Sequence, residues 1–92
     1  MNNREKLVAM DKIIRELEDL VNSQTSVLKK IGQIEAENIN LGDKFLDEKL
    51  PDVFEEVDTA VTQATAIHTE YIERRDKFVK DNNLDVPEEA EA

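Results

Sequence analysis

Apolar side chains recur along residues 7–31 in alternating steps of three and four residues. This spacing places them on one face of an α-helix. The row consists of Leu7, Met10, Ile14, Leu17, Val21, Gln24, Leu28 and Ile31. A second row runs directly beside it, at Ile13, Leu20, Val27 and Ile34. Two adjacent rows make a stripe wider than the seam of a two-stranded coiled coil, so we expect contact with more than one neighbouring helix.

The second half of the chain repeats this design. One helical face is expected to carry Leu46, Leu50, Val53, Val57, Ala60, Ala64, Ile67, Tyr71 and Phe78, flanked by Phe54 and Val61. The small side chains of Ala60 and Ala64 would let a facing helix approach closely. The two patterns predict amphipathic helices over residues 4–39 and 52–80.

The stretch NINLGDKFLDEKLP, residues 38–51, decides whether the two arms continue as one rod or fold back. Gly42 suits the position after a helix C-terminus, where positive φ is needed, and Asp43 can cap the start of a new helical segment. Pro51 fits the first turn of a new helix. We therefore expect a bend over residues 40–51, with DKFLDEKL either a helical turn or the true start of the second helix.

Composition agrees with a helical hairpin. The 92 residues are 39% hydrophobic and 37% charged, with two glycines, two prolines and no cysteine. That balance is typical of long surface helices and coiled coils, and the absence of cysteine excludes disulfides and thiolate chemistry. The predicted fold class is all-α: a two-helix antiparallel hairpin over residues 1–80, completed to a helical bundle by self- or hetero-association.

The charge is strongly acidic, with a formal net charge of −10. Such a chain repels nucleic-acid phosphate and anionic lipid, so neither is an expected partner. No run approaches the roughly 18 apolar residues of a membrane span, and the N-terminus does not resemble a secretory signal. We expect a soluble protein without membrane insertion, cytoplasmic or exported without a cleavable signal peptide. Residues 81–92 are expected to form a disordered acidic tail.

Two low-propensity stretches would lie side by side in an antiparallel hairpin. These are NSQTS, residues 22–26, and TAVTQAT, residues 59–65. Gln24 occupies a core position and could find a hydroxyl or amide across the interface. The favoured interpretation is a polar layer that fixes the register of the helices. The alternative is a binding notch or hinge halfway along the hairpin.

Side chains that carry chemistry are sparse. His68 is the only histidine, and no Glu-x-x-His pair or further zinc ligand accompanies it. Carboxylate pairs such as Glu55 and Glu56 lie on polar faces, without the burial that acid–base catalysis uses. With no glycine-rich phosphate loop and no Ser-His-Asp set, we expect no enzymatic activity, no cofactor, no metal and no small-molecule substrate.

A basic run lies near the end of the second arm. It consists of Arg74, Arg75, Lys77 and Lys80. Positive charge there interacts favourably with the helix dipole and with acids such as Glu5, Asp11 or Glu73. The functional alternative is a docking patch for an acidic partner.

A chain of this length, with two similar arms and a glycine near residue 42, resembles the WXG-type helical hairpins of type VII secretion. It also resembles the small helical partners of LXG toxins. Where that family has Trp-x-Gly, this chain has Asn-Leu-Gly at residues 40–42, and Arg75 stands where an acid would follow Tyr71 by four residues. Phe54 and Asp58 match the spacing of the toxin partners' Phe-x-x-x-Asp. The resemblance implies a helical protein that pairs with another helical protein.

The sequence as a whole predicts a non-enzymatic protein–protein interaction module. It would act as an adaptor, chaperone or co-secreted partner of another helical protein, or pair with itself as a homodimer. The residues expected to bind the partner are Ile13, Leu20, Val27, Ile34, Phe54 and Val61. The alternative is an acidic inhibitor or nucleic-acid mimic of phage origin that blocks a host protein. The nine acids and two bases of residues 35–58 favour it.

Overall fold

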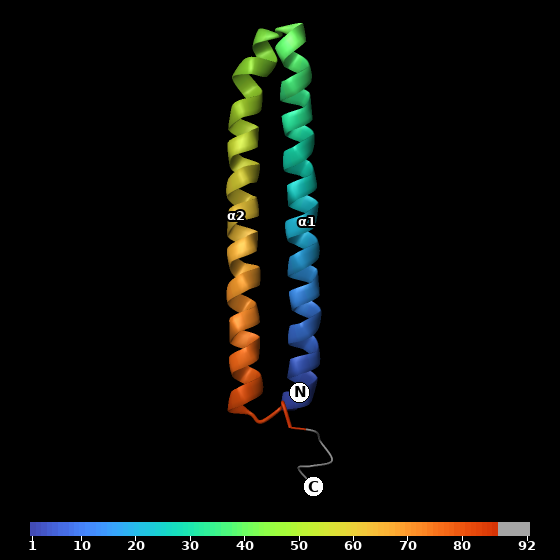
Figure 1. Cartoon of the computed structure of the whole chain (residues 1–92), viewed down its shortest axis with the longest axis vertical. Coiled ribbons are helices and arrows are strands. Elements are labelled where there is room, and N and C mark those ends of the chain that lie inside the picture. Colours follow the sequence, from blue (N-terminus) through green and yellow to red (C-terminus); the bar gives the residue numbers. More distant parts are fainter. Residues whose placement is uncertain (87–92) are drawn as a thin grey trace.

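The computed structural model describes residues 1–86 and contains two long helices that lie side by side (Figure 1). Helix α1 spans Asn3–Leu41 and helix α2 spans Lys44–Asp81. The helices run antiparallel, so the start of α1 and the end of α2 lie at one end and the bend at the other (Figure 1). The predicted all-α helical hairpin is confirmed. It is a rod with Cα extents of 70 × 18 × 15 Å.

Local hydrogen bonds fix where α1 begins and ends. Asn2 and Glu5 form a capping box, in which the Glu5 amide donates to Asn2 Oδ1 at 2.8 Å and the Asn2 amide donates to Glu5 Oε1 at 3.2 Å. At the other end Gly42 adopts φ +69°, and its amide donates to the Asn38 carbonyl at 2.6 Å. Gly42 therefore has the predicted role, because residues with a Cβ are strained at this φ.

The bend is shorter than the sequence predicts. Only Gly42 and Asp43 separate the helices, so the predicted bend over residues 40–51 is wrong at its C-terminal side. Asp43 is the N-cap of α2, and its Oδ1 accepts a hydrogen bond from the Leu46 amide at 3.1 Å. This cap starts the helix at once. The segment DKFLDEKL is thus the true beginning of the second helix.

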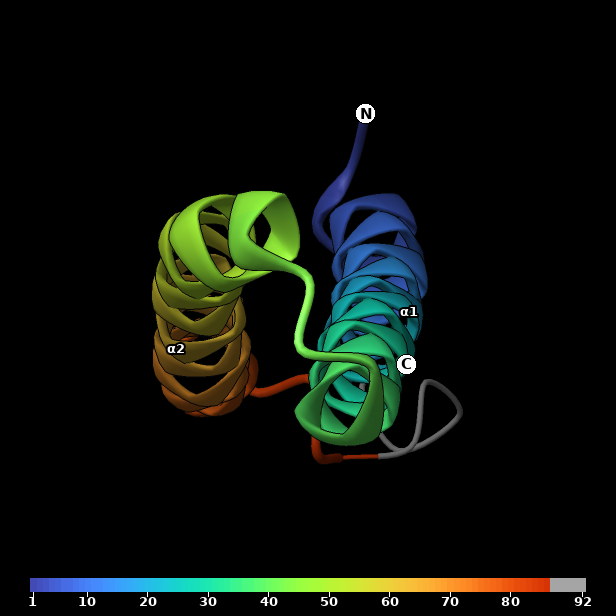
Figure 2. The same ribbon diagram turned by 90° about the horizontal axis from the view of Figure 1, so that it is seen from above.

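Pro51 lies inside α2 rather than in its first turn, which corrects the second boundary. Proline has no amide hydrogen, so the Asp47 carbonyl loses its intrahelical donor, and the proline ring crowds that carbonyl. A proline at such a position bends a helix. Figure 2 shows the first turns of α2, in light green, leaning toward α1 relative to the rest of the helix.

The end of α2 is an ordered turn. Asn83 has φ +54°, the Leu84 amide donates to the Val79 carbonyl at 2.9 Å and the Asn83 amide to the Lys80 carbonyl at 3.3 Å. These bonds form a Schellman motif, which satisfies carbonyls left free at a helix end. The tail predicted to be disordered from residue 81 is therefore ordered as far as residue 86. Its remainder, residues 87–92, lies outside the described residues.

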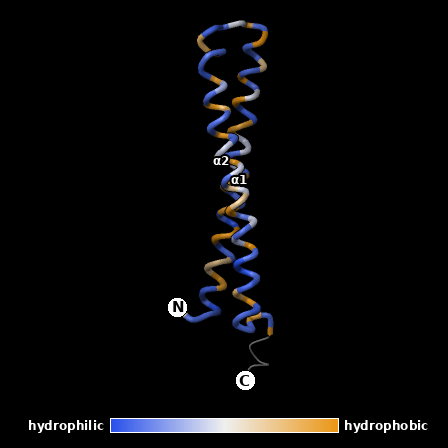
Figure 3. The backbone as a smooth tube through the Cα atoms, turned by 90° about the vertical axis from the view of Figure 1, so that its left-hand side faces the viewer, coloured by the Kyte–Doolittle hydropathy of each residue, from blue (hydrophilic) through white to orange (hydrophobic). Residues whose placement is uncertain are grey.

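The layer between the helices is thin. Among residues 1–86 the only hydrophobic residues that are buried are Ile31 and Ala64, 7% and 5% exposed. Apolar residues recur along both helices (Figure 3), yet twelve large ones in the described chain remain at least 38% exposed. Two helices can cover only one side of each other, so the hairpin by itself does not enclose a core.

Candidate functional site

The inner face of α1 is the row that the spacing predicts. Its members are half-buried or buried: Leu7, Met10, Ile14, Leu17, Val21, Gln24, Leu28 and Ile31. The row continues toward the bend with Glu35 and the buried Asn38. This agreement means that the second apolar row of α1 lies outside the contact with α2.

The inner face of α2 differs from the prediction by one row. The side chains turned away from solvent are Phe54, Val57, Val61, Ala64, His68, Tyr71, Arg75 and Phe78. Phe54 and Val61, which were expected on the outside, are half-buried in this row, whereas Val53 and Ile67 are 44% and 54% exposed. The row that contains Phe54 also contains the polar residues His68 and Arg75. A count of apolar residues therefore predicted the neighbouring row, with Val53 and Ile67, as the inner face.

Arg75 explains why a polar residue can occupy the inner row. Its Nε donates to Asp11 Oδ1 at 2.8 Å and its Nη2 donates to Asp11 Oδ2 at 3.4 Å, a two-pronged bond between the helices. The hydrogen bond that Arg75 donates to Asp11 raises the pKa of Arg75 above its ordinary value, although partial burial opposes the shift. One ion pair expected from the basic run is thus confirmed. Arg74, by contrast, bonds Glu70 on its own helix at 3.3 Å.

The outer row of α1 is exposed as a continuous line. Ile13, Leu20, Val27 and Ile34 are between 38% and 50% exposed, and each directly precedes a residue of the inner row. In α2 the apolar residues that directly precede inner-row residues are Val53, Ala60 and Ile67, and Arg74 continues their line toward the open end. Both helices are right-handed and run in opposite directions with their inner rows facing, so these two lines lie on the same side of the hairpin.

The register of the helices sets these two lines level with each other. Asp11 is opposite Arg75 near the open end, and Asn38 is opposite Asp47 near the bend. Counting from these contacts, Leu20 is level with Ile67, Val27 with Ala60 and Ile34 with Val53, each to within two residues. We define the apolar face as Ile13, Leu20, Val27, Ile34, Val53, Ala60 and Ile67.

The opposite side of the hairpin is mainly polar at the same levels. There the residues that directly follow inner-row residues include Glu18, Thr25, Asp58 and Thr65, while the half-buried Ile72 is an apolar exception toward the open end. The two sides of the rod therefore differ in character along its middle. This asymmetry makes the apolar face a candidate interaction surface, since a helix pair that works alone would keep both sides polar.

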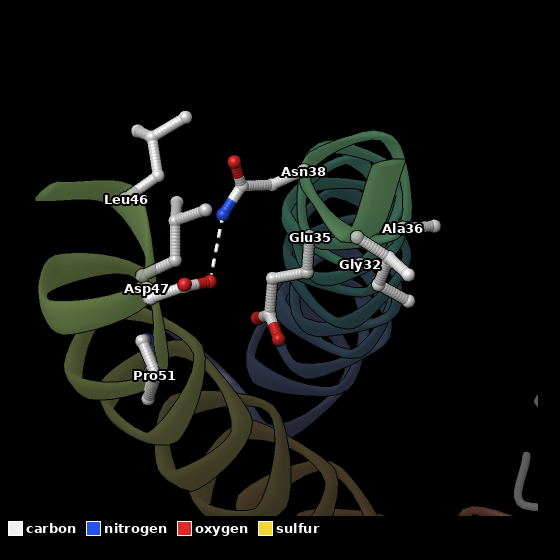
Figure 4. Close-up of a pocket in the computed structure, with 9 residues that line it drawn as sticks. Gly32, Glu35, Ala36, Asn38, Leu46, Asp47 and Pro51 are labelled. Atoms are coloured by element: carbon white, nitrogen blue, oxygen red, sulfur yellow. Dashed lines mark hydrogen bonds between the residues drawn. The ribbon is translucent and has the colours of Figure 1, made fainter. Parts of the chain in front are cut away.

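A buried amide holds the bend. Asn38 is 3% exposed, and its Nδ2 donates to Asp47 Oδ1 at 2.7 Å and to the Asp43 carbonyl at 3.1 Å. Its Oδ1 accepts from the Asp43 amide at 2.9 Å. Figure 4 shows Asn38 reaching from α1 toward Asp47 of α2. Sequence reasoning missed Asn38. Its signal was an asparagine on the inner row, four residues before Gly42.

A hollow of about 350 Å³ lies beside this amide, between the two helices. Its lining comes from both helices and includes Gly32, Glu35, Leu46, Leu50 and Pro51 (Figure 4). Glu35 Oε1 is buried there without a hydrogen-bond partner. Within residues 1–86 no cluster of three or more His, Asp or Glu side chains is placed to hold a metal ion.

Gln24 lies on the inner row of α1 and its Oε1 is buried without a hydrogen-bond partner. The nearby hydroxyl groups do not donate a hydrogen bond to this oxygen. Thr25 donates to the Val21 carbonyl, Thr62 to the Asp58 carbonyl and Thr65 to the Val61 carbonyl, each on its own helix. A hydroxyl has one hydrogen to give, so these bonds exhaust their donors.

In the described part of the chain neither helix has a stretch long and apolar enough to cross a membrane. Comparisons with protein-family models, with curated proteins and with solved structures find no match to this chain. The candidate site therefore has to be interpreted from its own geometry, in which the apolar face and the Asn38 clamp are the two principal features.

Proposed function

We propose that the protein is a non-enzymatic helical interaction module that works by covering its apolar face with other helices. The single observation that carries the proposal is the apolar face itself, a line of half-exposed aliphatic side chains on one side of a hairpin with almost no enclosed core. The partner is helical, because straight rows of side chains at heptad spacing pack against another helix.

The energetics support the proposal. Fully burying a Val, Leu or Ile side chain contributes about 1.5–3 kcal/mol, so a half-exposed one leaves roughly 1 kcal/mol unrealised. Summed over the apolar face this reaches several kcal/mol, which is comparable with the total stability of a small domain, about 5–15 kcal/mol. Association therefore supplies stability that the hairpin lacks alone.

The first test measures the purified chain by light scattering on a sizing column and by circular dichroism during heating. We expect either an assembly larger than the monomer or a monomer that melts at low temperature. A monomer that unfolds cooperatively at high temperature would contradict the proposal, because it would need no partner.

The second test uses two matched substitutions on α1. Val27→Glu places a charge in the middle of the apolar face and should abolish assembly while leaving part of the helical content. Val8→Glu makes the same change at a position that is 69% exposed and lies outside the apolar face, and it should leave assembly intact. Equal behaviour of the two variants would show that assembly uses another surface.

Within this class the role is that of an adaptor, a chaperone or a co-secreted partner. The resemblance to WXG-type hairpins and LXG-toxin partners supports a co-secreted partner of another helical protein. Co-expression with a helical secreted protein encoded by a neighbouring gene tests this role. We expect the pair to copurify, and Val27→Glu to separate them while Val8→Glu does not.

A second candidate function rests on a different observation. Asp52, Glu55 and Glu56 line an open hollow on the outer side of α2, next to Thr59. Carboxylates held on one rigid helix could imitate a nucleic-acid backbone and block a DNA- or RNA-binding protein. An inhibitor of this kind displaces DNA from its target, and the displacement weakens steeply with salt. Binding through the apolar face has no such dependence.

A further inference from the structure

We infer that the helices covering the apolar face are those of a second copy of this chain, with both bends at the same end of a four-helix bundle. The inference rests on the proposed function and names its partner. Three observations support it: the area of one side of the rod, the charged residues along the edges of the apolar face, and the buried Gln24 oxygen that has no hydrogen-bond partner in the hairpin.

The side of the rod that carries the apolar face is large enough for a stable dimer. Helix α1 has 39 residues, which at about 1.5 Å per residue gives a length of about 58 Å. The rod is at least 15 Å wide, so one side presents about 900 Å². A standard specific interface buries about 800 Å² on each partner. A second hairpin laid along this side meets that requirement without any further element.

A twofold axis along the rod gives the arrangement that the bundle requires. It places α1 of one copy over α2 of the other, so that every neighbouring pair of helices is antiparallel. Because the axis is parallel to the rod, each level of one copy lies against the same level of the other. Leu20 therefore meets Ile67 of the second copy, and Ile34 meets Val53 of the second copy.

Polar residues, most of them charged, border the apolar face on its two outer edges. On α1 these are Glu16, Ser23, Lys30 and Glu37, and on α2 they are Lys49, Glu56, Gln63 and Glu70. Most lie four residues before a member of the apolar face, hence beside it on the helix. In the twofold arrangement the edge of α1 in one copy meets the edge of α2 in the other.

The pairs that meet are largely complementary. Lys30 is nineteen residues after Asp11, and Glu56 is nineteen before Arg75, so the Asp11–Arg75 contact places them at one level. The same count brings Glu37 level with Lys49. Each pair occurs twice in the dimer. Glu16 meets Glu70, a like-charge pair, but Arg74 bonds Glu70 at 3.3 Å and offsets its charge.

A reversed dimer, with bends at opposite ends, places α1 on α1 and α2 on α2. In the register that brings Glu16 to Lys30 of the second copy, Glu56 meets Glu70 and Lys49 meets Lys77. A shift by one heptad in one direction brings Glu16 against Glu37, with Lys49 and Glu70 as its attractive pair. A shift in the other direction leaves a single attractive pair, Glu56 with Lys77. The shared-end arrangement has two attractive pairs along each edge. Other acids near its bends, such as Glu48, Asp52 and Glu55, are exposed, and salt at physiological concentration screens charges more than about 8 Å apart.

Gln24 provides the third argument. It lies between Leu20 and Val27 on α1, four residues after one and three before the other, and its buried Oε1 has no partner in the hairpin. Ala64, small and buried, lies two to three residues from that level on α2 and leaves room beside it. Across the twofold axis Gln24 faces Gln24 of the second copy, whose Nε2 can donate to that oxygen. Buried amides of this kind fix register in helical bundles.

The test is a charge exchange measured by sedimentation of the full chain over a range of concentrations. Lys30→Glu and Glu56→Lys should each weaken the dimer about tenfold, because two attractive pairs become repulsive. The double variant should return to within about threefold of the original dissociation constant. Matched controls are Lys29→Glu and Glu55→Lys, the adjacent residues, which point away from the interface and should change it less than about twofold.

Orientation is tested with cysteine pairs, which is simple because the chain has no cysteine. Ser23→Cys together with Gln63→Cys should form covalent dimers on oxidation, whereas Ser23→Cys alone should not. Efficient cross-linking of Ser23→Cys alone would overturn the shared-end arrangement. So would a double charge variant no tighter than the single ones.

A monomeric mass at every concentration would overturn the second copy as partner. The thermal unfolding of that monomer then decides separately about the proposed function. A poorly helical or easily melted monomer would leave the interaction module intact and point to a different helical partner. A monomer that is stable to heating would contradict both the second copy as partner and the proposed function.

Discussion

Asn38 Nδ2 donates a 2.7 Å hydrogen bond to Asp47 Oδ1 across the two-residue bend, and the same amide group bonds both the amide and the carbonyl of Asp43. One buried side chain thus joins the last turn of α1 to the cap and first turn of α2. This contact makes so tight a reversal possible, because it satisfies the backbone groups that the bend would otherwise leave without partners.

Asn38→Ala should therefore lower the free energy of unfolding by about 1–3 kcal/mol, since it removes three hydrogen bonds at a buried site. Asn40→Ala changes the same residue type two positions on, at an exposed site, and should cost less than about 0.5 kcal/mol. Urea unfolding followed by circular dichroism measures both. Equal values would show that the clamp does not stabilise the bend.

The two glycines should respond in opposite directions to alanine. Gly32 lies inside α1 with no atom within 4 Å of an added Cβ, so Gly32→Ala should stabilise the protein by about 0.5–1 kcal/mol. Gly42 has φ +69°, where a Cβ is strained, so Gly42→Ala should destabilise it by about 1 kcal/mol. The difference in melting temperature between the two variants is the measurement. A stabilising Gly42→Ala would contradict the geometry of the bend.

The Asp11–Arg75 pair can be tested by a double-mutant cycle with Asp11→Ala and Arg75→Ala. Both side chains are about one-third exposed, so we expect a modest coupling energy, about 0.5–1 kcal/mol, that declines with added salt. The exposed Arg74–Glu70 pair is the control, with an expected coupling of about 0.3–0.5 kcal/mol. A coupling near zero for Asp11–Arg75 would mean that packing alone sets the phase of α2.

Gln24→Leu should raise the free energy of unfolding of the monomeric hairpin by about 1 kcal/mol, because it removes a buried oxygen that the hairpin leaves unsatisfied and adds apolar contact. Gln33→Leu, at an exposed site of the same helix, should change stability by less than about 0.5 kcal/mol. Thermal unfolding of both variants, at a protein concentration low enough to keep the chain monomeric, gives the comparison. A destabilising Gln24→Leu in the monomer would contradict the unsatisfied oxygen on which the pairing of Gln24 across the dimer rests.

The ends of the helices show which features can be predicted from a few neighbouring residues. Gly42 and Asp43 were assigned their roles from residue type alone, because positive φ and N-capping depend on one or two side chains. Pro51 was misplaced, since the rule that proline begins a helix competes with the N-cap Asp43, eight residues earlier. The turn after Asp81 was missed because the acidic composition of the tail outweighed the Asn83–Leu84 signal for a Schellman motif.

The candidate surface was predicted for α1 and only in part for α2. Ile13, Leu20, Val27 and Ile34 follow from spacing because their neighbouring row has no competitor as the inner face. In α2 two adjacent rows are similar, one containing Val53 and Ile67, the other Phe54 and Val61. Periodicity cannot choose between them, and the polar His68 and Arg75 made the wrong one more attractive.

What the sequence by itself determined is the hairpin: the heptad spacing, the glycine at the reversal and the lack of any membrane-length apolar run depend on residues close together in the chain. What only the tertiary structure decided is the phase of α2 and therefore which side of the rod is apolar. That choice depends on contacts such as Asp11 with Arg75, which are 64 residues apart. Their energy exists only once the two helices have met.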